Sequence, residues 1–250
     1  MRKIILPLVG FCLSISLVLV PAKKAGSKNI ESNDIALISN STYAAKSSAT
    51  SVDSVSNELY DSLQLNKVGL TKAALEFAYR GHQVLEEKGV LTNPDILTVC
   101  DFTQSSLSKR MYIIDLKNQK LLLNTYVAHG RNSGLDYAEH FSNRPESLES
   151  SLGFYVTKNT YQGKHGLSLK LSGLDRGFND NAESRDVVVH GAPYIGEQRA
   201  NSSYMGRSFG CPAVPQKLAP TVINLIKNGT CLFIYHPNET YVANSSILNS

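Results

Sequence analysis

The stretches that decide the fold are Val187-Val188-Val189-His190-Gly191 and Arg207-Ser208-Phe209-Gly210-Cys211-Pro212-Ala213-Val214. The first is a short apolar run, typical of a buried strand, and it ends in a histidine. The second places a cysteine in a tight turn, because Gly210 admits unusual backbone angles and Pro212 fixes the angle that follows. A strand that ends in His190 and a turn that ends in Cys211 can meet across a sheet. Together they would supply a nucleophile and its base.

Three histidines precede a glycine, and each is a candidate base: His129, His165 and His190. His190 is the strongest candidate, since it ends the strand that leads to the cysteine turn. The carbonyl of Gly191 could orient its imidazole, as the third member of a triad does. A lone histidine at a strand end is more often a hydrogen-bonded structural residue, but its pairing with Cys211 favours catalysis.

The cysteine turn also offers groups that would stabilise an oxyanion. The backbone N–H groups of Gly210 and Cys211 are candidates, whereas Pro212 has no N–H to donate. Ser208 belongs to the same turn. A helix predicted over 216–227 begins soon afterwards, and the positive end of its dipole would favour a thiolate.

The N-terminus has the features of a secretory signal. Arg2 and Lys3 precede a largely apolar run, and Val20-Pro21-Ala22 fits a cleavage site. We therefore predict a signal peptide over 1–22, with a retained membrane anchor as the alternative. Cleavage would leave an exported protein with no membrane association, in the periplasm or cell envelope.

Charge and ligand spacing exclude several classes of partner. The 250 residues include 25 basic and 21 acidic side chains, and loss of Arg2 and Lys3 with the signal leaves 23 against 21. This balance, without a basic stripe, argues against a nucleic-acid partner. No short CxxC or HxxxH spacing occurs, so we expect neither a metal nor another cofactor.

Cysteine counting points to a free thiol. Cys12 lies in the predicted signal, which leaves three cysteines in the exported chain. An odd number indicates a free thiol or an intermolecular bond. Cys100 and Cys231 lie in strand-like runs, where they either pair with each other or remain as two buried, inert thiols.

Composition divides the chain into a body and two tails. The Ser- and Asn-rich segment 23–64 is expected to be a flexible tail, 65–240 the folded domain, and 241–250 a C-terminal tail. Two long loops, 130–151 and 175–185, are rich in Asn, Arg, Ser and Gly. Loops of this length are often functional, and their composition suits a polar, extended substrate.

Within the body, the hydrophobic patterns predict a mainly β fold, a compact sandwich or barrel with flanking helices. A helix over 71–88 would be capped by Thr71 and ended by Gly89. The predicted strands are 97–102, 110–116, 120–128, 153–157, 187–190 and 230–235.

The pair His190-Gly191 followed by Ser208-Phe209-Gly210-Cys211 resembles the signature of the L,D-transpeptidase (YkuD-like) cell-wall enzymes. It is most similar to a divergent branch, the murein L,D-transpeptidase catalytic domain family, in which a Ser-aromatic-Gly-Cys-Pro-Ala-Val run replaces the usual Ser-His-Gly-Cys. The resemblance covers residues 65–236. It extends to Phe141-Ser142-Asn143, Ser150-Ser151-Leu152-Gly153, Tyr161-Gln162-Gly163-Lys164-His165-Gly166 and Leu171-Ser172-Gly173-Leu174-Asp175.

The resemblance implies a β-rich, L,D-transpeptidase-like fold and a two-step acyl transfer on peptidoglycan stem peptides. Cys211 would attack the carbonyl of the third residue of a tetrapeptide stem, and D-Ala would leave a thioester behind. His190 would activate the thiol. An amine of a second stem would then form a 3→3 crosslink, whereas water as acceptor would make the site an L,D-carboxypeptidase.

Two positions depart from the usual pattern of these enzymes. Phe209 stands where typical members have a second histidine, and Ala213 stands where they have an arginine. Arginine suits a stem carboxylate because its fork binds both oxygens. The candidates for replacing these groups or binding the stem are His165, Arg185, Arg207, Tyr161 and Lys164.

Two further interpretations remain open. A non-catalytic wall-binding domain that kept the fold would tolerate an unreactive Cys211. A cysteine peptidase or amidase of another fold could use the same Cys211 and His190 but would not explain the wider resemblance. We expect the protein to act as a monomer.

Overall fold

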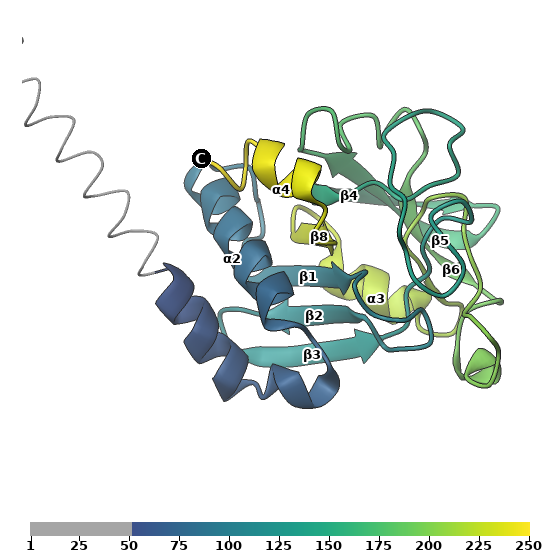
Figure 1. The fold of residues 1–250 in the computed structure, drawn as a ribbon, viewed down its shortest axis with the longest axis horizontal. Coiled ribbons are helices and arrows are strands. Elements are labelled where there is room, and N and C mark those ends of the chain that lie inside the picture. The colour runs from purple at the N-terminus through teal and green to yellow at the C-terminus, as the bar shows by residue number, and fades with distance from the viewer. Residues whose placement is uncertain (1–51) are drawn as a thin grey trace, which may run out of the picture. The chain divides into compact units, whose positions relative to one another are not determined.

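An eight-stranded mixed sheet organises residues 52–250, the part of the chain that the computed structural model describes (Figure 1). The predicted signal peptide and most of the predicted N-terminal tail lie outside these residues. The strands are β1 (Ile96–Asp101), β2 (Met111–Asp115), β3 (Lys120–Thr125), β4 (Gly153–Gly163), β5 (Gly166–Gly173), β6 (Val188–Ala192), β7 (Ala213–Pro215) and β8 (Cys231–Tyr235). Their order in the sheet is β3-β2-β1-β8-β4-β5-β6-β7. The pairs β1–β8 and β6–β7 are parallel and the others antiparallel.

Helices flank this sheet. They are α2 (Lys72–Glu87), α3 (Ala219–Ile226) and α4 (Glu239–Asn244), with a further helix over 52–62 and two 3-10 turns, η1 (Leu65–Val68) and η2 (Glu197–Arg199). The prediction for α2 is confirmed in detail. The hydroxyl of Thr71 accepts a hydrogen bond from the Ala74 N–H at 3.3 Å, and Gly89 follows the helix at a φ of +66°.

The sheet curls around α3. This helix contacts β1, β5 and β6, which are well separated in the sheet order. Its buried side chains are Ala219, Val222, Ile223 and Ile226. At the open seam, Ala128 forms an isolated bridge to Ala213 and links the segment after β3 to β7. The result is a nearly closed, barrel-like sheet, which confirms the predicted fold class.

The folded body extends beyond the predicted boundaries at both ends. The helix over 52–62 contributes the buried side chain of Leu59, although the composition of this region predicts a flexible tail. At the other end, Tyr241, Ile247 and Leu248 are buried in the core, so 241–250 is not a tail. These apolar side chains are too sparse to form a recognisable local pattern, but each one belongs to the hydrophobic core.

Several strands differ from the predictions. β4 runs to Gly163 rather than ending near Thr157, and it forms a hairpin with β5, a strand that is not among those predicted. The three-residue β7 is also new. The alternatives for the two strand cysteines are resolved, because Cys100 and Cys231 are both free and fully buried.

Candidate active site

Two strands bring the histidine and the cysteine turn together. β6 and β7 pair in parallel, with His190 opposite Ala213. Cys211 lies two residues before Ala213, at the point where the chain enters β7. It therefore lies beside Val188, which is two residues before His190 on the neighbouring strand. Residues two apart in a strand point to the same face and are separated by about 7 Å.

The thiol of Cys211 is held by the backbone of the segment that leads into β6. The N–H of Val188 donates to Sγ at 3.5 Å, and the thiol donates to the carbonyl of Asp186 at 3.5 Å. Burial raises the pKa of the Cys211 thiol, and the Val188 N–H and the charge of Arg185 oppose that effect only in part. Cys211 is thus a protonated thiol at neutral pH.

His190 is buried and has a fixed tautomer. Its Nδ1 lies 2.9 Å from the carbonyl of Gly191, to which it donates, so Nε2 carries the free lone pair. Gly191 itself must be a glycine, since an added Cβ would lie 2.9 Å from the Ala219 side chain. Burial, and secondarily the charges of His165 and Lys164, lower the pKa of His190. The imidazole therefore remains neutral and basic at neutral pH.

The β4–β5 hairpin contributes two of the predicted residues. His165 lies at the exposed turn, and its ring stacks on His190 with centroids 4.4 Å apart. The exposed Lys164 is close enough to lower the pKa values of both His190 and Cys211. The hairpin thus covers the histidine and adds positive charge beside the thiol.

Ser208 shapes the cysteine turn. Its hydroxyl donates to the Cys211 carbonyl at 2.6 Å and accepts from the Gly210 N–H at 3.1 Å. Gly210 is therefore not a free oxyanion donor, which corrects that part of the prediction. The Cys211 N–H has no acceptor among the described residues. A glycine is required at 210, where φ is +122° and a Cβ would lie 2.8 Å from the Glu149 carbonyl.

Helix α3 lies farther from the thiol than the sequence predicts. It begins at Ala219 rather than near Gln216, and β7 separates it from Cys211. The groups that lower the pKa of the thiol are instead Val188, Arg185 and Lys164.

Arg185 is anchored in the loop beneath the turn. Its guanidinium donates to the Ser142 carbonyl at 2.8 Å and the Glu149 carbonyl at 2.9 Å, and also to the hydroxyls of Ser147 and Ser151. Most of its N–H groups are thus occupied. The structure places Arg185 as a loop anchor and a fixed positive charge near Cys211, rather than as an open clamp.

Arg207 and Tyr161 line two different hollows. Arg207 donates to the carbonyls of Arg131 at 2.8 Å and Gly134 at 3.1 Å. Tyr161 lines a hollow of about 310 Å³ that reaches the 186–188 segment beside the thiol. Tyr161 therefore borders the hollow next to the 186–188 segment, while the guanidinium of Arg207 is partly occupied by the loop.

The two positions that depart from the family pattern, Phe209 and Ala213, lie in different environments. Phe209 is 67% exposed, and the guanidinium of Arg131 lies 5.9 Å from its ring centroid. Ala213 is fully buried against Ala128 and Met205, in a small apolar cluster that an arginine would disrupt. Of the candidate replacements, His165 is the one whose ring stacks on His190.

His129 is a structural residue. It is fully buried, with Nδ1 accepting from Arg110 at 2.7 Å and Nε2 facing the Gly134 carbonyl at 3.3 Å. Burial and the neighbouring guanidinium lower the pKa of His129 to about 4. No local sequence pattern identifies its partner Arg110. Arg110 directly precedes β2 and His129 lies after β3, so only the fold brings the two side chains together.

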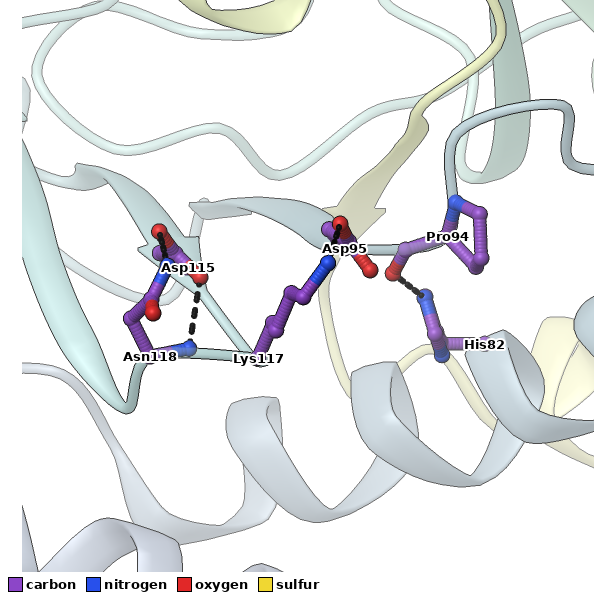
Figure 2. Close-up of polar contacts among 6 residues, drawn as sticks. All are labelled: His82, Pro94, Asp95, Asp115, Lys117 and Asn118. Carbon is purple, nitrogen blue, oxygen red and sulfur yellow. Dashed lines mark hydrogen bonds and ion pairs between the residues drawn. The ribbon is translucent and has the colours of Figure 1, made fainter.

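A separate hollow of about 370 Å³ lies beside α2. There His82 donates from Nε2 to the Pro94 carbonyl at 2.7 Å, and Lys117 pairs with Asp95 at 3.4 Å (Figure 2). None of the residues lining it belongs to the cysteine site. The described residues contain no group of three metal-ligating side chains, and no helix among them is long and apolar enough to span a membrane.

Comparison with known proteins identifies the family. A family model described as L,D-transpeptidase catalytic domain matches residues 66–235. Similar solved structures include an L,D-transpeptidase from Mycobacterium smegmatis (12% identity, TM-score 0.35, 57% of this chain and 59% of that one). Others are the helical cell shape determining protein Pgp2 from Campylobacter jejuni (12%, 0.38, 63% and 56%) and an L,D-transpeptidase from Xylanimonas cellulosilytica (15%, 0.32, 55% and 59%).

This chain spans less than two thirds of the length of each of those structures. No curated protein matches it. The family model covers all eight strands of the sheet, including both strands that position His190 and Cys211. The chain therefore belongs to the L,D-transpeptidase catalytic domain family.

Proposed function

We propose that this protein is a cysteine-dependent L,D-transpeptidase that acts on peptidoglycan tetrapeptide stems and forms 3→3 crosslinks through a thioester. The observation that carries the proposal is the parallel pairing of β6 and β7, which sets the Cys211 thiol beside the strand of His190 within a domain of this family. Export to the periplasm or cell envelope and action as a monomer are parts of the same proposal.

In the first step, Nε2 of His190 accepts the thiol proton and Sγ of Cys211 attacks the carbonyl of the third stem residue. The C–S bond forms, the C–N bond to D-Ala breaks, and the imidazolium returns its proton to the leaving amine. The Cys211 N–H is the donor best placed for the oxyanion, since the N–H of Gly210 is occupied.

In the second step, an amine of another stem attacks the thioester. Nε2 of His190 takes a proton from this amine, a new amide bond forms, and the C–S bond breaks. The proton then returns to sulfur, which regenerates the thiol. With water in place of the amine, the same sequence releases a shortened stem, as an L,D-carboxypeptidase would.

The two pKa shifts support general-base catalysis rather than a preformed ion pair. Burial raises the pKa of Cys211 and lowers the pKa of His190, so both groups are neutral before substrate binds. Among the described residues, no hydrogen bond joins the imidazole to the thiol. Catalytic contacts are often long before substrate binds, and one water can bridge such a gap.

Carbapenem acylation tests the proposal. The purified protein is incubated with a carbapenem and its intact mass is measured. We expect one adduct on the wild type and on Cys231→Ala, a control that removes a fully buried thiol, and none on Cys211→Ala. The same absence of adduct on the wild type and Cys211→Ala would leave the non-catalytic wall-binding alternative.

Product analysis then separates the two reactions. Tetrapeptide-bearing muropeptides are incubated with the protein and the products are separated by chromatography and weighed by mass spectrometry. Crosslinked dimers support transpeptidation, whereas shortened stems alone support L,D-carboxypeptidase activity. His190→Ala should abolish both products, and retained turnover would show that another group is the base.

A further inference from the structure

A pocket of about 270 Å³ lies next to the cysteine turn, on the side that bears Phe209. Three arginines and three aromatic residues line it: Arg131, Arg199, Arg207, Tyr194, Tyr204 and Phe209. Arg131 lies in the connection after β3, whereas Arg199 and Arg207 both lie in the connection between β6 and β7. Their convergence is therefore a product of the fold and not of a basic run in the sequence.

The positive charge of this arginine pocket is not neutralised by the protein. Within residues 52–250, no carboxylate forms an ion pair with any of the three guanidinium groups. The nearby Glu197 is occupied, since it pairs with Lys109 at 2.9 Å and accepts from the Tyr126 hydroxyl at 2.9 Å. Three like charges so close together repel one another, and a bound anion would relieve that repulsion.

The arginine pocket also has unused hydrogen-bond donors. Nε of Arg199 is buried and has no partner among the described residues. Its Nη2 makes only a long contact with the Tyr204 carbonyl, at 3.4 Å. Arg207, by contrast, uses Nη1 on the carbonyls of Arg131 and Gly134. Arg199 thus keeps a donor without a protein partner, Arg131 makes no side-chain hydrogen bond within the described residues, and Arg207 is the most firmly held of the three.

Aromatic rings hold the guanidinium groups in place. The Tyr204 ring lies 4.9 Å from the Arg207 guanidinium and 5.8 Å from that of Arg199. Phe209 plays the same part for Arg131, at 5.9 Å. Such contacts restrict the long arginine side chains, so less conformational freedom is lost when they bind an anion.

The arginine pocket is adjacent to the nucleophile. Phe209 is two residues from Cys211 in the same turn, and Tyr204, Gly206 and Arg207 belong to the segment that leads into that turn. Gly206 lets Tyr194 approach the chain, because an added Cβ would lie 2.3 Å from the Tyr194 ring. A ligand in the pocket and a carbonyl at Sγ can therefore belong to one molecule.

We propose that the arginine pocket binds a free carboxylate of the peptide stem while a neighbouring carbonyl of the same stem lies at Cys211. This rests on the proposed function, because the stem is the substrate that would present both groups. Planar guanidinium forks match the two oxygens of a carboxylate. The pocket would thus distinguish stems with free carboxylates from stems in which they are amidated.

Two pairs of synthetic tetrapeptide stems test this inference. One pair differs only in a free or amidated carboxylate on the second residue, and the other differs only at the side-chain carboxylate of the third. We expect the wild type to prefer the free form of at least one pair by about 10-fold in kcat/KM, mainly through KM. Arg199→Gln should remove that preference, while Arg176→Gln, an exposed arginine in another loop, should keep it.

Binding to Cys211→Ala separates this inference from the proposed function. Calorimetry with the same stems and this variant needs no turnover. A preference for the free carboxylate that Arg199→Gln abolishes supports the pocket even if the wild type proves inactive. Equal binding of free and amidated forms in both pairs overturns it. Competition by inorganic phosphate without any effect of amidation would also overturn it, and would assign the pocket to a phosphate ligand.

Discussion

The imidazole rings of His165 and His190 are stacked, with centroids 4.4 Å apart and planes inclined by 25°. His190 is buried in β6, whereas His165 lies at the exposed turn of the β4–β5 hairpin. Stacking shields the buried imidazole and places a second titratable ring against it. The hairpin turn therefore influences the protonation of the proposed base.

Replacing His165 should raise the pKa of His190. His165→Phe keeps an aromatic ring against His190 but removes the charge that helps to lower its pKa. Because burial is the larger cause, the pKa should move toward the ordinary value of about 6.5 without reaching it. An NMR titration of the His190 ring measures the shift, and the acid limb of the rate should move in the same direction. His140→Phe, at an exposed histidine elsewhere, should change neither, and a lowered pKa in His165→Phe would contradict the prediction.

Alkylation of Cys211 should report a thiol rather than a preformed thiolate. Burial raises the pKa of this group, so the rate of reaction with iodoacetamide should rise with pH and reach its midpoint above about 8.5, the usual value for cysteine. Mass spectrometry of samples quenched over time measures the rate. Cys211→Ala should remain unlabelled under native conditions, because Cys100 and Cys231 are fully buried. A rate that is already constant at pH 7 would instead indicate an ion pair with His190.

Gly81→Ala should destabilise the protein, although alanine normally stabilises a helix by about 1 kcal/mol relative to glycine. A Cβ at Gly81 would lie 2.0 Å from Cζ of Phe154, so α2 could not pack on β4 as it does. Overpacking of this kind costs about 1–3 kcal/mol. Urea unfolding measures the change. The double variant Gly81→Ala/Phe154→Leu should lose less stability than the two single losses combined, and a gain in stability for Gly81→Ala alone would refute the packing argument.

The sequence predicts those elements whose signals are local. Thr71 and Gly89 mark the two ends of α2, and the strands of the first meander are found within two or three residues of their observed bounds. β5 could have been found as well, since Leu167, Leu169 and Leu171 alternate with polar residues. The three residues of β7 are too few to show a period, and only pairing with β6 makes them a strand.

In the candidate site too, the features with local sequence signals are predicted and those that depend on long-range contacts are not. Ser208 and Cys211 belong to one short turn, and the carbonyl that orients His190 belongs to the next residue, Gly191. Residue types alone therefore predict both features. The role of Arg185 could not be predicted, because the loop over 142–151 folds back onto it from about 40 residues away. Arg131 and Arg199 were missed for the same reason: neither has a neighbour in sequence that marks it as part of a pocket.

The buried pair of His129 and Arg110 should make the protein sensitive to acid. The pKa of His129 is about 4 in the folded protein and about 6.5 when the chain is unfolded. Between these values the unfolded chain binds the additional proton, so the free energy of unfolding rises with pH. This difference in proton binding by His129 changes the free energy of unfolding by about 3 kcal/mol. The stability is fully present above pH 6.5 and is lost as the pH falls toward 4.

His129→Asn tests this linkage. Asparagine keeps an acceptor for the Arg110 guanidinium, which donates to Nδ1 at 2.7 Å, but it does not titrate. The variant should be less stable at pH 7, yet its free energy of unfolding in urea should depend less on pH between 4.5 and 6.5. Some dependence should remain, because burial also lowers the pKa values of His82 and His236. His140→Asn, at an exposed site, should retain the slope of the wild type. An unchanged slope in His129→Asn would show that the acid sensitivity arises elsewhere.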